Sequence, residues 1–245
     1  MHTDPSNSTQ IDLWKISVSN PDPTLEYLAA LLSPDETDRA NRFVFEGDRI
    51  NFIRVRGMLR IILGRYLQIP PGLVELRYGH GGKPQVDGLN PYRLCFNVSH
   101  SAEIALIAVG FGRDLGVDVE WIRRGIDERE IATHFFSPRE IQELSSLPGE
   151  QLTVGFFNCW TRKEAFVKAL GTGLSFPLTA FDVSLRPGEP AAVTRIDRGP
   201  GEQMQWTLRD VSPGGDYAAA LAVEGEAEVT IVWRSIAENF ESALP

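Results

Sequence analysis

The chain of 245 residues is long enough for one domain or for two small halves packed together, and its 42% hydrophobic and 23% charged residues are ordinary for a globular protein. A formal net charge of −9 at pH 7 argues against a general nucleic-acid binder, which presents a basic face to the phosphates. No apolar run approaches the about 20 residues of a membrane helix, and the N-terminus carries no secretory pattern, so we expect a cytoplasmic protein.

The first part of the chain predicts a strand, two helices and then several strands. Residues 11–18 alternate apolar and polar side chains, which predicts a strand. A helix begins at Ser33, whose capping box is completed by Glu36, and apolar residues at helical spacing predict a long helix from about Asp48 to Leu67. The remaining predicted elements are strands at 73–79, 94–99 and 103–110, a glycine-rich loop at 80–88, and a turn at His100–Ser101.

The second part of the chain repeats this order. The sequence LGVDVEWI at 115–122 predicts a strand, FSPREIQEL at 136–144 predicts a second capped helix, and a long helix runs from Leu152 to about Leu170. Further strands are predicted at 181–185, 206–211, 217–223 and 229–236.

A shift of 104 residues superposes the two parts. Ser33 falls on Ser137, the strand at 11–18 falls on the strand at 115–122, and the helix around Arg60 falls on the helix around Glu164. We infer an internal duplication, with chance similarity of two small α/β units as the alternative. The predicted fold is α/β (α+β): two similar halves, 1–111 and 112–245, related by a pseudo-twofold axis. Each half has a small, mostly antiparallel sheet packed with a long helix, and the active site lies in the cleft between them.

Two acidic residues mark the strand at 115–122. Asp118 and Glu120 are two residues apart, so both point to one face, while Val117 and Val119 point to the core. Adjacent carboxylates repel each other and need a cation or a raised pKa. Oxygen ligands of this kind suit Mg²⁺, which usually takes one or two carboxylates together with substrate phosphates. The alternative is a solvated strand edge.

A third acid lies on the second long helix. Phe157, Trp160, Glu164 and Lys168 fall on neighbouring positions of one helix face. This places a charged pair beside buried aromatic side chains. The alternative is an ordinary surface ion pair between residues i and i+4, which stabilises a helix by only about 0.3–0.5 kcal/mol.

Several basic and polar residues are candidates for binding an anion. Glycines beside Lys83 allow a backbone to approach a phosphate, and His100 of the Ser99–His100–Ser101 turn can donate a hydrogen bond to one. The first long helix carries arginines that form either an anion-binding fork or a solvated basic face: Arg49, Arg56 and Arg60, preceded by Arg39 and Arg42.

The two cysteines, Cys95 and Cys159, both sit in apolar patterns. We expect buried, reduced thiols, with a disulfide or a catalytic thiol as the alternatives.

Together these motifs resemble a known family. The strand Gly116-Val117-Asp118-Val119-Glu120 is followed some forty residues later by WTRKEAFVK at 160–168, with GKP and SHS upstream. In this order they resemble the 4′-phosphopantetheinyl transferases of the larger, monomeric Sfp-like type. The match runs from about Ser33 to Asp182, and the residues on either side match no motif of the family.

The resemblance implies a cytoplasmic monomer that moves the phosphopantetheine arm of coenzyme A onto a serine of an apo acyl, peptidyl or aryl carrier protein and releases adenosine 3′,5′-bisphosphate. It implies Mg²⁺, or Mn²⁺ in its place, and neither nucleic acid nor membrane as a partner. At the positions that match the family's motifs, the resemblance implies that Asp118, Glu120 and Glu164 bind the metal and that Glu164 and Lys168 are catalytic. It further implies the following contacts with coenzyme A: Arg49, Arg56, Lys83, Ser99, His100 and Lys168.

Three other functions remain open on the sequence. They are a Mg²⁺-dependent hydrolase of phosphate anhydrides, a non-catalytic coenzyme A-binding protein on the same scaffold, and a structural interaction protein. The presence of all three acids and the lysine favours the transferase. Whether the carrier serves fatty acid, polyketide or nonribosomal peptide synthesis is not encoded in these motifs.

Overall fold

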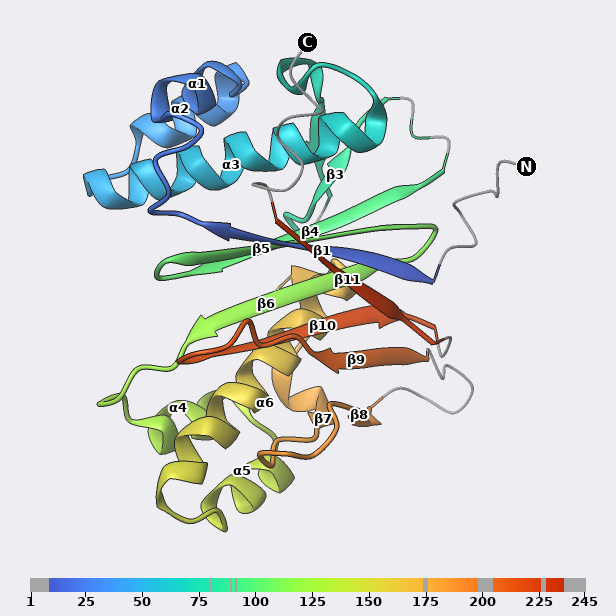
Figure 1. The fold of residues 1–245 in the computed structure, drawn as a ribbon. Coiled ribbons are helices and arrows are strands. Elements are labelled where there is room, and N and C mark those ends of the chain that lie inside the picture. Colours follow the sequence, from blue (N-terminus) through green and yellow to red (C-terminus); the bar gives the residue numbers. More distant parts are fainter. Residues whose placement is uncertain are drawn as a thin grey trace.

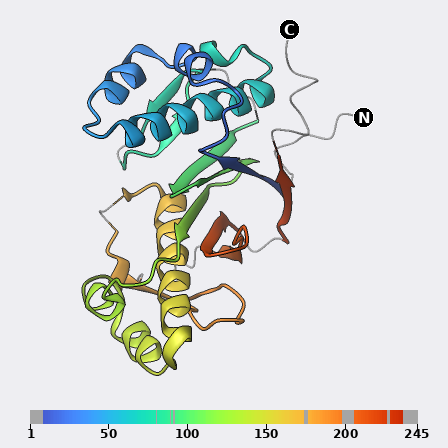
Figure 2. The same ribbon diagram turned by 60° about the vertical axis from the view of Figure 1, so that its left-hand side comes forward.

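The chain folds into four layers, helices outside and two sheets inside (Figure 1). The structure, a computed structural model, describes residues 9–79, 81–88, 90, 92–173, 176–197, 205–225 and 228–235. Helices α1–α3 cover one outer side and α4–α6 the other, and the view turned by 60° shows the same order (Figure 2). Within these ranges no helix is long and apolar enough to cross a bilayer.

The first half contains the predicted strands and two predicted helices together with three elements that were not predicted, α1, η2 and β3. Its elements are β1 (Gln10–Ser17), α1 (Leu25–Ala30), α2 (Pro34–Asn41), α3 (Glu46–Leu67), the short 3-10 helix η2 (Pro71–Leu73), β2 (Leu76–Tyr78), β3 (Pro84–Val86), β4 (Leu94–Ser101) and β5 (Ile104–Phe111).

One turn prediction in this half was wrong. β4 continues through Ser101, so His100 lies on the strand, and the chain turns at Ala102–Glu103 instead. Ala102 takes a positive φ of 47° there, and an alanine gives no sequence signal for such a turn.

The second half adds α4 and β8 to the predicted elements. It consists of β6 (Leu115–Trp121), α4 (Glu128–Phe135), α5 (Pro138–Ser145), α6 (Gly149–Leu170), the 3-10 helix η4 (Leu178–Ala180), β7 (Phe181–Val183), β8 (Val193–Ile196), β9 (Trp206–Asp210), β10 (Tyr217–Glu224) and β11 (Thr230–Arg234). Two predicted positions, His80 of the glycine-rich loop and Ile236 of the last strand, lie outside the described residues.

The strands form two main sheets, which confirms the predicted architecture. The order is β11-β1-β5-β4 in the first and β6-β10-β9 in the second, and β2-β3 and β7-β8 form two small hairpins. All pairs are antiparallel except β1 with β11. Strand β11, near the end of the chain, therefore belongs to the sheet of the first half.

Three apolar clusters hold these layers together. One lies between α3 and the first sheet, one between α6 and the second sheet, and one between the two sheets. Along β5, Leu106 and Ala108 face the cluster between the sheets while Ile107 and Val109 face α3. Because both faces are covered, the interior of this strand is buried and uniformly apolar.

The duplication extends to a buried ion pair in each half. The capping-box residue Glu36 of α2 accepts from Arg60 of α3 at 2.6 Å, and Glu140 of α5 pairs with Lys163 of α6 at 2.8 Å. Each cation also donates to a backbone carbonyl after its helix: Arg60 to Val74 at 2.8 Å and Lys163 to Phe181 at 2.6 Å.

These pairs correct the register of the duplication at the long helices. Both ends of α6 lie 103 residues after the ends of α3, not 104. Arg60 therefore corresponds to Lys163, and the counterpart of Glu164 is Ile61.

Both cysteines are free, as predicted. Cys159 is buried and Cys95 is half-buried.

Candidate active site

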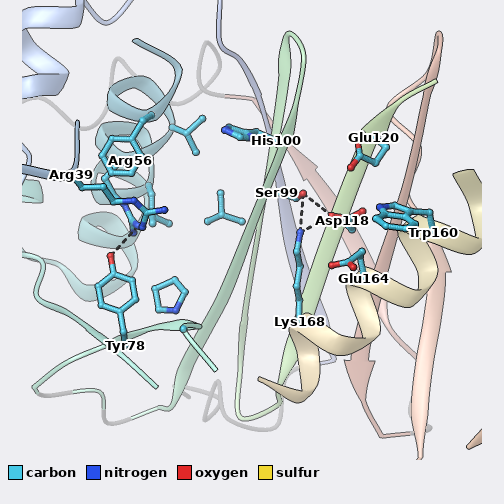
Figure 3. A pocket seen from close by; sticks show the side chains of 16 residues that line it. Arg39, Arg56, Tyr78, Ser99, His100, Asp118, Glu120, Trp160, Glu164 and Lys168 are labelled. Carbon is cyan, nitrogen blue, oxygen red and sulfur yellow. Dashed lines mark hydrogen bonds and ion pairs between the residues drawn. The ribbon is translucent and has the colours of Figure 1, made fainter. Parts of the chain in front are cut away.

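The site begins with a close contact between a helix and a strand. A Cβ at Gly116 of β6 would lie 2.2 Å from the carbonyl oxygen of Ala165 and 2.4 Å from the amide nitrogen of Ala169, so only glycine fits. This brings α6 directly against β6. As a result Glu164 and Lys168 of the helix lie beside Asp118 and Glu120 of the strand (Figure 3).

The three carboxylates influence one another through space. Burial is the largest cause of the raised pKa of Glu120, and the charge of Asp118 raises it further. Burial also raises the pKa of Glu164, and Asp118 and then Glu120 add to the effect. Asp118 itself is only 4% exposed. Glu120 and Glu164, whose charged forms are disfavoured beside Asp118, form with it a site with affinity for a cation.

Lys168 supplies one positive charge to this cluster. Its ammonium donates to Asp118 Oδ1 at 2.6 Å and to Ser99 Oγ at 3.0 Å, while Ser99 Oγ in turn donates to the same carboxylate oxygen at 2.9 Å. Glu164 and Lys168 are four residues apart, but the lysine pairs with Asp118, so the two do not form a simple surface ion pair. The lysine reaches across to β6, and α6 sets the positions of both side chains.

A divalent cation fits the chemistry of this donor set, although the donors are not yet grouped around one point. Asp118 Oδ2 is buried and accepts no hydrogen bond, which leaves one oxygen of the central acid available to a metal. Within the described ranges no three His, Cys, Asp or Glu side chains already form a metal-binding cluster. Ligation by Asp118, Glu120 and Glu164 therefore requires side-chain adjustment, which hard oxygen ligands around Mg²⁺ accommodate.

A cavity of about 550 Å³ opens between the carboxylates and the first half of the chain. On the side opposite the acids lie Arg39 and Arg56, with His100 between (Figure 3). Both guanidinium groups stack on Phe52, at 5.2 and 5.8 Å from the ring centroid, and Arg56 also donates to Tyr78 Oη at 3.1 Å. This end of the cavity combines positive charge with aromatic surface.

A second cavity of about 640 Å³ shares Trp160, Glu164 and Lys168 with the first. Its lining is mostly apolar and includes Phe135 and Leu178. The catalytic candidates Glu164 and Lys168 therefore line both the cavity that holds the acids and arginines and the mostly apolar cavity.

Most of the predicted coenzyme A contacts line these cavities, but two have different surroundings from those expected. Lys83 lines the second cavity, and its ammonium donates to the backbone carbonyls of Leu115 at 2.8 Å and Ala169 at 3.1 Å. Arg49 lies on an exposed part of α3, pairs with Glu46 at 2.9 Å, and is not among the described residues that line the first cavity.

Three residues of the site were not singled out from the sequence: Phe52, Tyr78 and Phe135. Ser101 was named only as part of a turn, without a role of its own. Aromatic residues at helical or strand spacing carry no sign that distinguishes a cavity wall from a core. Arg39, which the sequence suggested only as a residue preceding the helix, lines the first cavity because α2 packs beside α3.

Comparison with known proteins assigns both halves to the same family. Residues 18–111 match the model described as 4′-phosphopantetheinyl transferase, N-terminal, and residues 114–222 match the 4′-phosphopantetheinyl transferase superfamily. These two matches divide the chain close to the start of β6.

Named relatives agree with these matches. The 4′-phosphopantetheinyl transferase HetI of Nostoc sp. is 42% identical over 219 residues, which are 89% of each chain. The L-aminoadipate-semialdehyde dehydrogenase-phosphopantetheinyl transferase of Homo sapiens is 30% identical over 81% of this chain and 69% of its own. The transferase psf-1 of Bacillus pumilus is 29% identical over 96% of this chain and 97% of its own.

Proposed function

Since this chain belongs to the 4′-phosphopantetheinyl transferase superfamily, we propose how its cleft carries out the transfer. The enzyme moves the 4′-phosphopantetheine arm of coenzyme A to a serine of a carrier protein. Adenosine 3′,5′-bisphosphate is the expected second product, because the arm leaves with one phosphate of the pyrophosphate.

Coenzyme A is a long molecule with one highly charged end, and the two cavities offer matching surroundings. We assign the adenosine 3′-phosphate end to the first cavity, where Arg39, Arg56 and His100 face the space. The aromatic rings of Phe52 and Tyr78 add flat apolar surface beside those charges. Arg56 also pairs with the buried carboxylate of Glu36 at 3.4 Å, so the exposed Arg39 is the more available cation. The contact proposed for Lys83 is less direct, because its ammonium donates to two backbone carbonyls. Arg49 pairs with Glu46 and is not among the described residues that line either cavity, so we assign it no direct contact with coenzyme A.

The pantetheine arm would then occupy the second, mostly apolar cavity. Because Glu164 and Lys168 line both cavities, a molecule spanning the two places its pyrophosphate beside them. Binding of both ends positions the reacting phosphorus and so lowers the barrier of the reaction.

The residues at the shared edge have distinct roles in this proposal. Asp118, Glu120 and Glu164 would hold Mg²⁺, and the bound ion would neutralise charge on the phosphoryl oxygens. Glu164 would accept the proton of the carrier serine, directly or through a water. Lys168 would donate a hydrogen bond or a proton to the leaving phosphate oxygen.

The single observation that carries the metal role is the buried Asp118 Oδ2, which accepts no hydrogen bond beside two other acids of raised pKa. All of these residues come from one chain, so the proposed site is complete in a monomer.

Mass spectrometry of a panel of apo carrier proteins, incubated with coenzyme A and Mg²⁺, tests the function. We expect Asp118→Ala to lower transfer at least about 100-fold, since metal stabilisation contributes several kcal/mol and each 1.36 kcal/mol is tenfold in rate. Glu150→Ala is the matched control, because Glu150 is an exposed acid in the first turn of α6. Near wild-type transfer by Asp118→Ala would contradict the metal role. Consumption of coenzyme A without any carrier would favour a hydrolase.

The nucleotide end is tested with a pair of arginines. Arg39→Ala should raise the KM for coenzyme A several-fold with little change in kcat, because Arg39 lines the first cavity and is exposed. Arg49→Ala should change neither constant appreciably. An equal effect of the two substitutions would show that the cavity does not hold the charged end of coenzyme A.

A further inference from the structure

A row of three polar side chains on β4 joins the two halves of the molecule. β4 and β6 belong to different sheets. Asn97 Oδ1 nevertheless accepts the backbone N–H of Val117 at 2.9 Å, and Ser99 Oγ accepts that of Val119 at 3.3 Å. These residues alternate along β4, so they share one face of the strand.

The third member of the row is Ser101. Its Oγ accepts the backbone N–H of Trp121 at 3.0 Å and donates to Glu120 Oε2 at 2.8 Å. A serine hydroxyl has one proton, and a hydroxyl that donates to a carboxylate while accepting a backbone N–H has a fixed orientation. Ser101 therefore fixes one oxygen of Glu120 relative to the backbone of the strand that carries it.

We propose that Ser101 is a positioning residue that holds Glu120 ready for the divalent cation. This inference rests on the proposed function, because it assumes that Glu120 is a metal ligand. With Oε2 held by the hydroxyl, the Glu120 side chain is restricted at the edge of the first cavity, which Asp118 and Glu164 also line (Figure 3). A partner that orients a metal ligand typically changes metal affinity or activity 10–100-fold when removed.

Ser99 makes the same pair of contacts one step earlier on the row, to Val119 and Asp118. It also accepts from Lys168, so substitution of Ser99 would disturb the proposed catalytic lysine as well. Ser101 is the cleaner probe, since its side chain makes no such contact with Lys168.

The row also contains its own control. Asn97 accepts a backbone N–H of β6 as the serines do, and the described contacts of its side chain include no carboxylate of the cluster. Asn97 also lines the second cavity, so Mn²⁺ binding is measured at a coenzyme A concentration that saturates each variant. Asn97→Ala and Ser101→Ala each leave one β6 amide without its acceptor, so both should lower the melting temperature. Only Ser101→Ala should alter the metal site.

The test is direct Mn²⁺ binding, measured by electron paramagnetic resonance of free Mn²⁺ at saturating coenzyme A and without carrier protein. We expect Ser101→Ala to weaken Mn²⁺ binding about tenfold, Ser101→Thr to restore it by keeping the hydroxyl, and Asn97→Ala to leave it within about twofold of wild type. Wild-type affinity in Ser101→Ala, or equal weakening in Asn97→Ala, would overturn the inference.

Two further experiments distinguish the role of Ser101 from the metal-ligand role of Glu120. In a Glu120→Gln background, Ser101→Ala should add no further loss of Mn²⁺ affinity, and a full additional tenfold loss would overturn the inference. If Ser101→Ala does not fold, Ser101→Cys, with its weaker donor, should fall between wild type and the tenfold loss. Failure of the wild type to bind Mn²⁺ would overturn the proposed metal site itself, and the inference with it.

Discussion

The two halves share one plan but differ where the long helix meets its strand. In the first half Arg65 of α3 stacks over Trp14 of β1, at 5.7 Å from the ring centroid. In the second half the corresponding positions are Lys168 of α6 and Asp118 of β6, which form an ion pair at 2.6 Å. The same geometry thus holds a cation against an aromatic ring in one half and against a carboxylate in the other.

A second difference lies at the next residue of each long helix. On β1 the carboxylate of Asp12 accepts from Tyr66 Oη of α3 at 2.5 Å, whereas the corresponding pair on β6 and α6 is Gly116 and Ala169. Loss of both polar side chains lets α6 approach its strand more closely than Asp12 would allow. The framework was kept in both copies, and the chemistry depends on a few substitutions at this contact.

The largest expected effect concerns the framework that the halves share. Glu140→Ala should lower the free energy of unfolding by about 3–5 kcal/mol, because it leaves Lys163, which is 0% exposed, without its anionic partner. Glu36→Ala should lower the free energy of unfolding by a similar amount, because it leaves the buried Arg60 without this carboxylate. Urea denaturation measures both.

Glu143→Ala serves as the control for these two variants. Glu143 pairs with Arg186 at 2.9 Å near the surface, where such a pair contributes about 0–1 kcal/mol. If Glu140→Ala costs no more than Glu143→Ala, the buried pair does not stabilise the half as argued.

A smaller effect is expected at the contact that distinguishes the halves. Gly116→Ala should lower the free energy of unfolding by about 1–3 kcal/mol, since a Cβ would overlap the backbone of α6. Displacing Glu164 and Lys168 by about 1 Å should lower transfer about 100-fold. The two measurements are urea denaturation and carrier modification by mass spectrometry.

Gly47→Ala provides the comparison in the first half. A Cβ at Gly47 of α3 meets nothing within 4 Å, so this substitution should be neutral or should stabilise the helix by up to about 1 kcal/mol. Normal transfer and stability in Gly116→Ala would mean that α6 does not need its close approach to β6.

Local patterns were sufficient to predict the two long helices, the strand β6 and the common face of Asp118 and Glu120. Periodicity and capping boxes are properties of neighbouring residues, so a sequence carries them directly. The 103-residue register of the helices was missed by one residue, because the connection from α5 to α6 is one residue shorter than that from α2 to α3. A uniform shift cannot reveal a change in loop length.

The basic residues were harder to assign because their roles depend on tertiary neighbours. Lys83 lies beside glycines, as an anion-binding lysine would, yet its ammonium donates to carbonyls of β6 and α6 that are distant in sequence. Arg49 and Arg56 lie on the same helix, and only the packing of α2 and β2 around α3 shows which of them faces the cavity. Ser101 looked like part of a turn until the position of β6 was known.

The smallest expected effect tests the charge that separates Glu164 from its apolar counterpart Ile61. Burial raises the pKa of Glu164 above its ordinary value, so the folded protein holds this proton more tightly than the unfolded chain. The stability contributed by that proton is present below the ordinary value and is lost as pH rises through the raised pKa. At pH 7 without divalent cation, Glu164→Gln should therefore melt at a slightly higher temperature than wild type, and the difference should vanish at pH 4. Equal melting temperatures at both pH values would contradict this account, and Glu150→Gln on the same helix is the control. Because the same substitution should abolish transfer, it would show that the second half gives up stability for its function at this position.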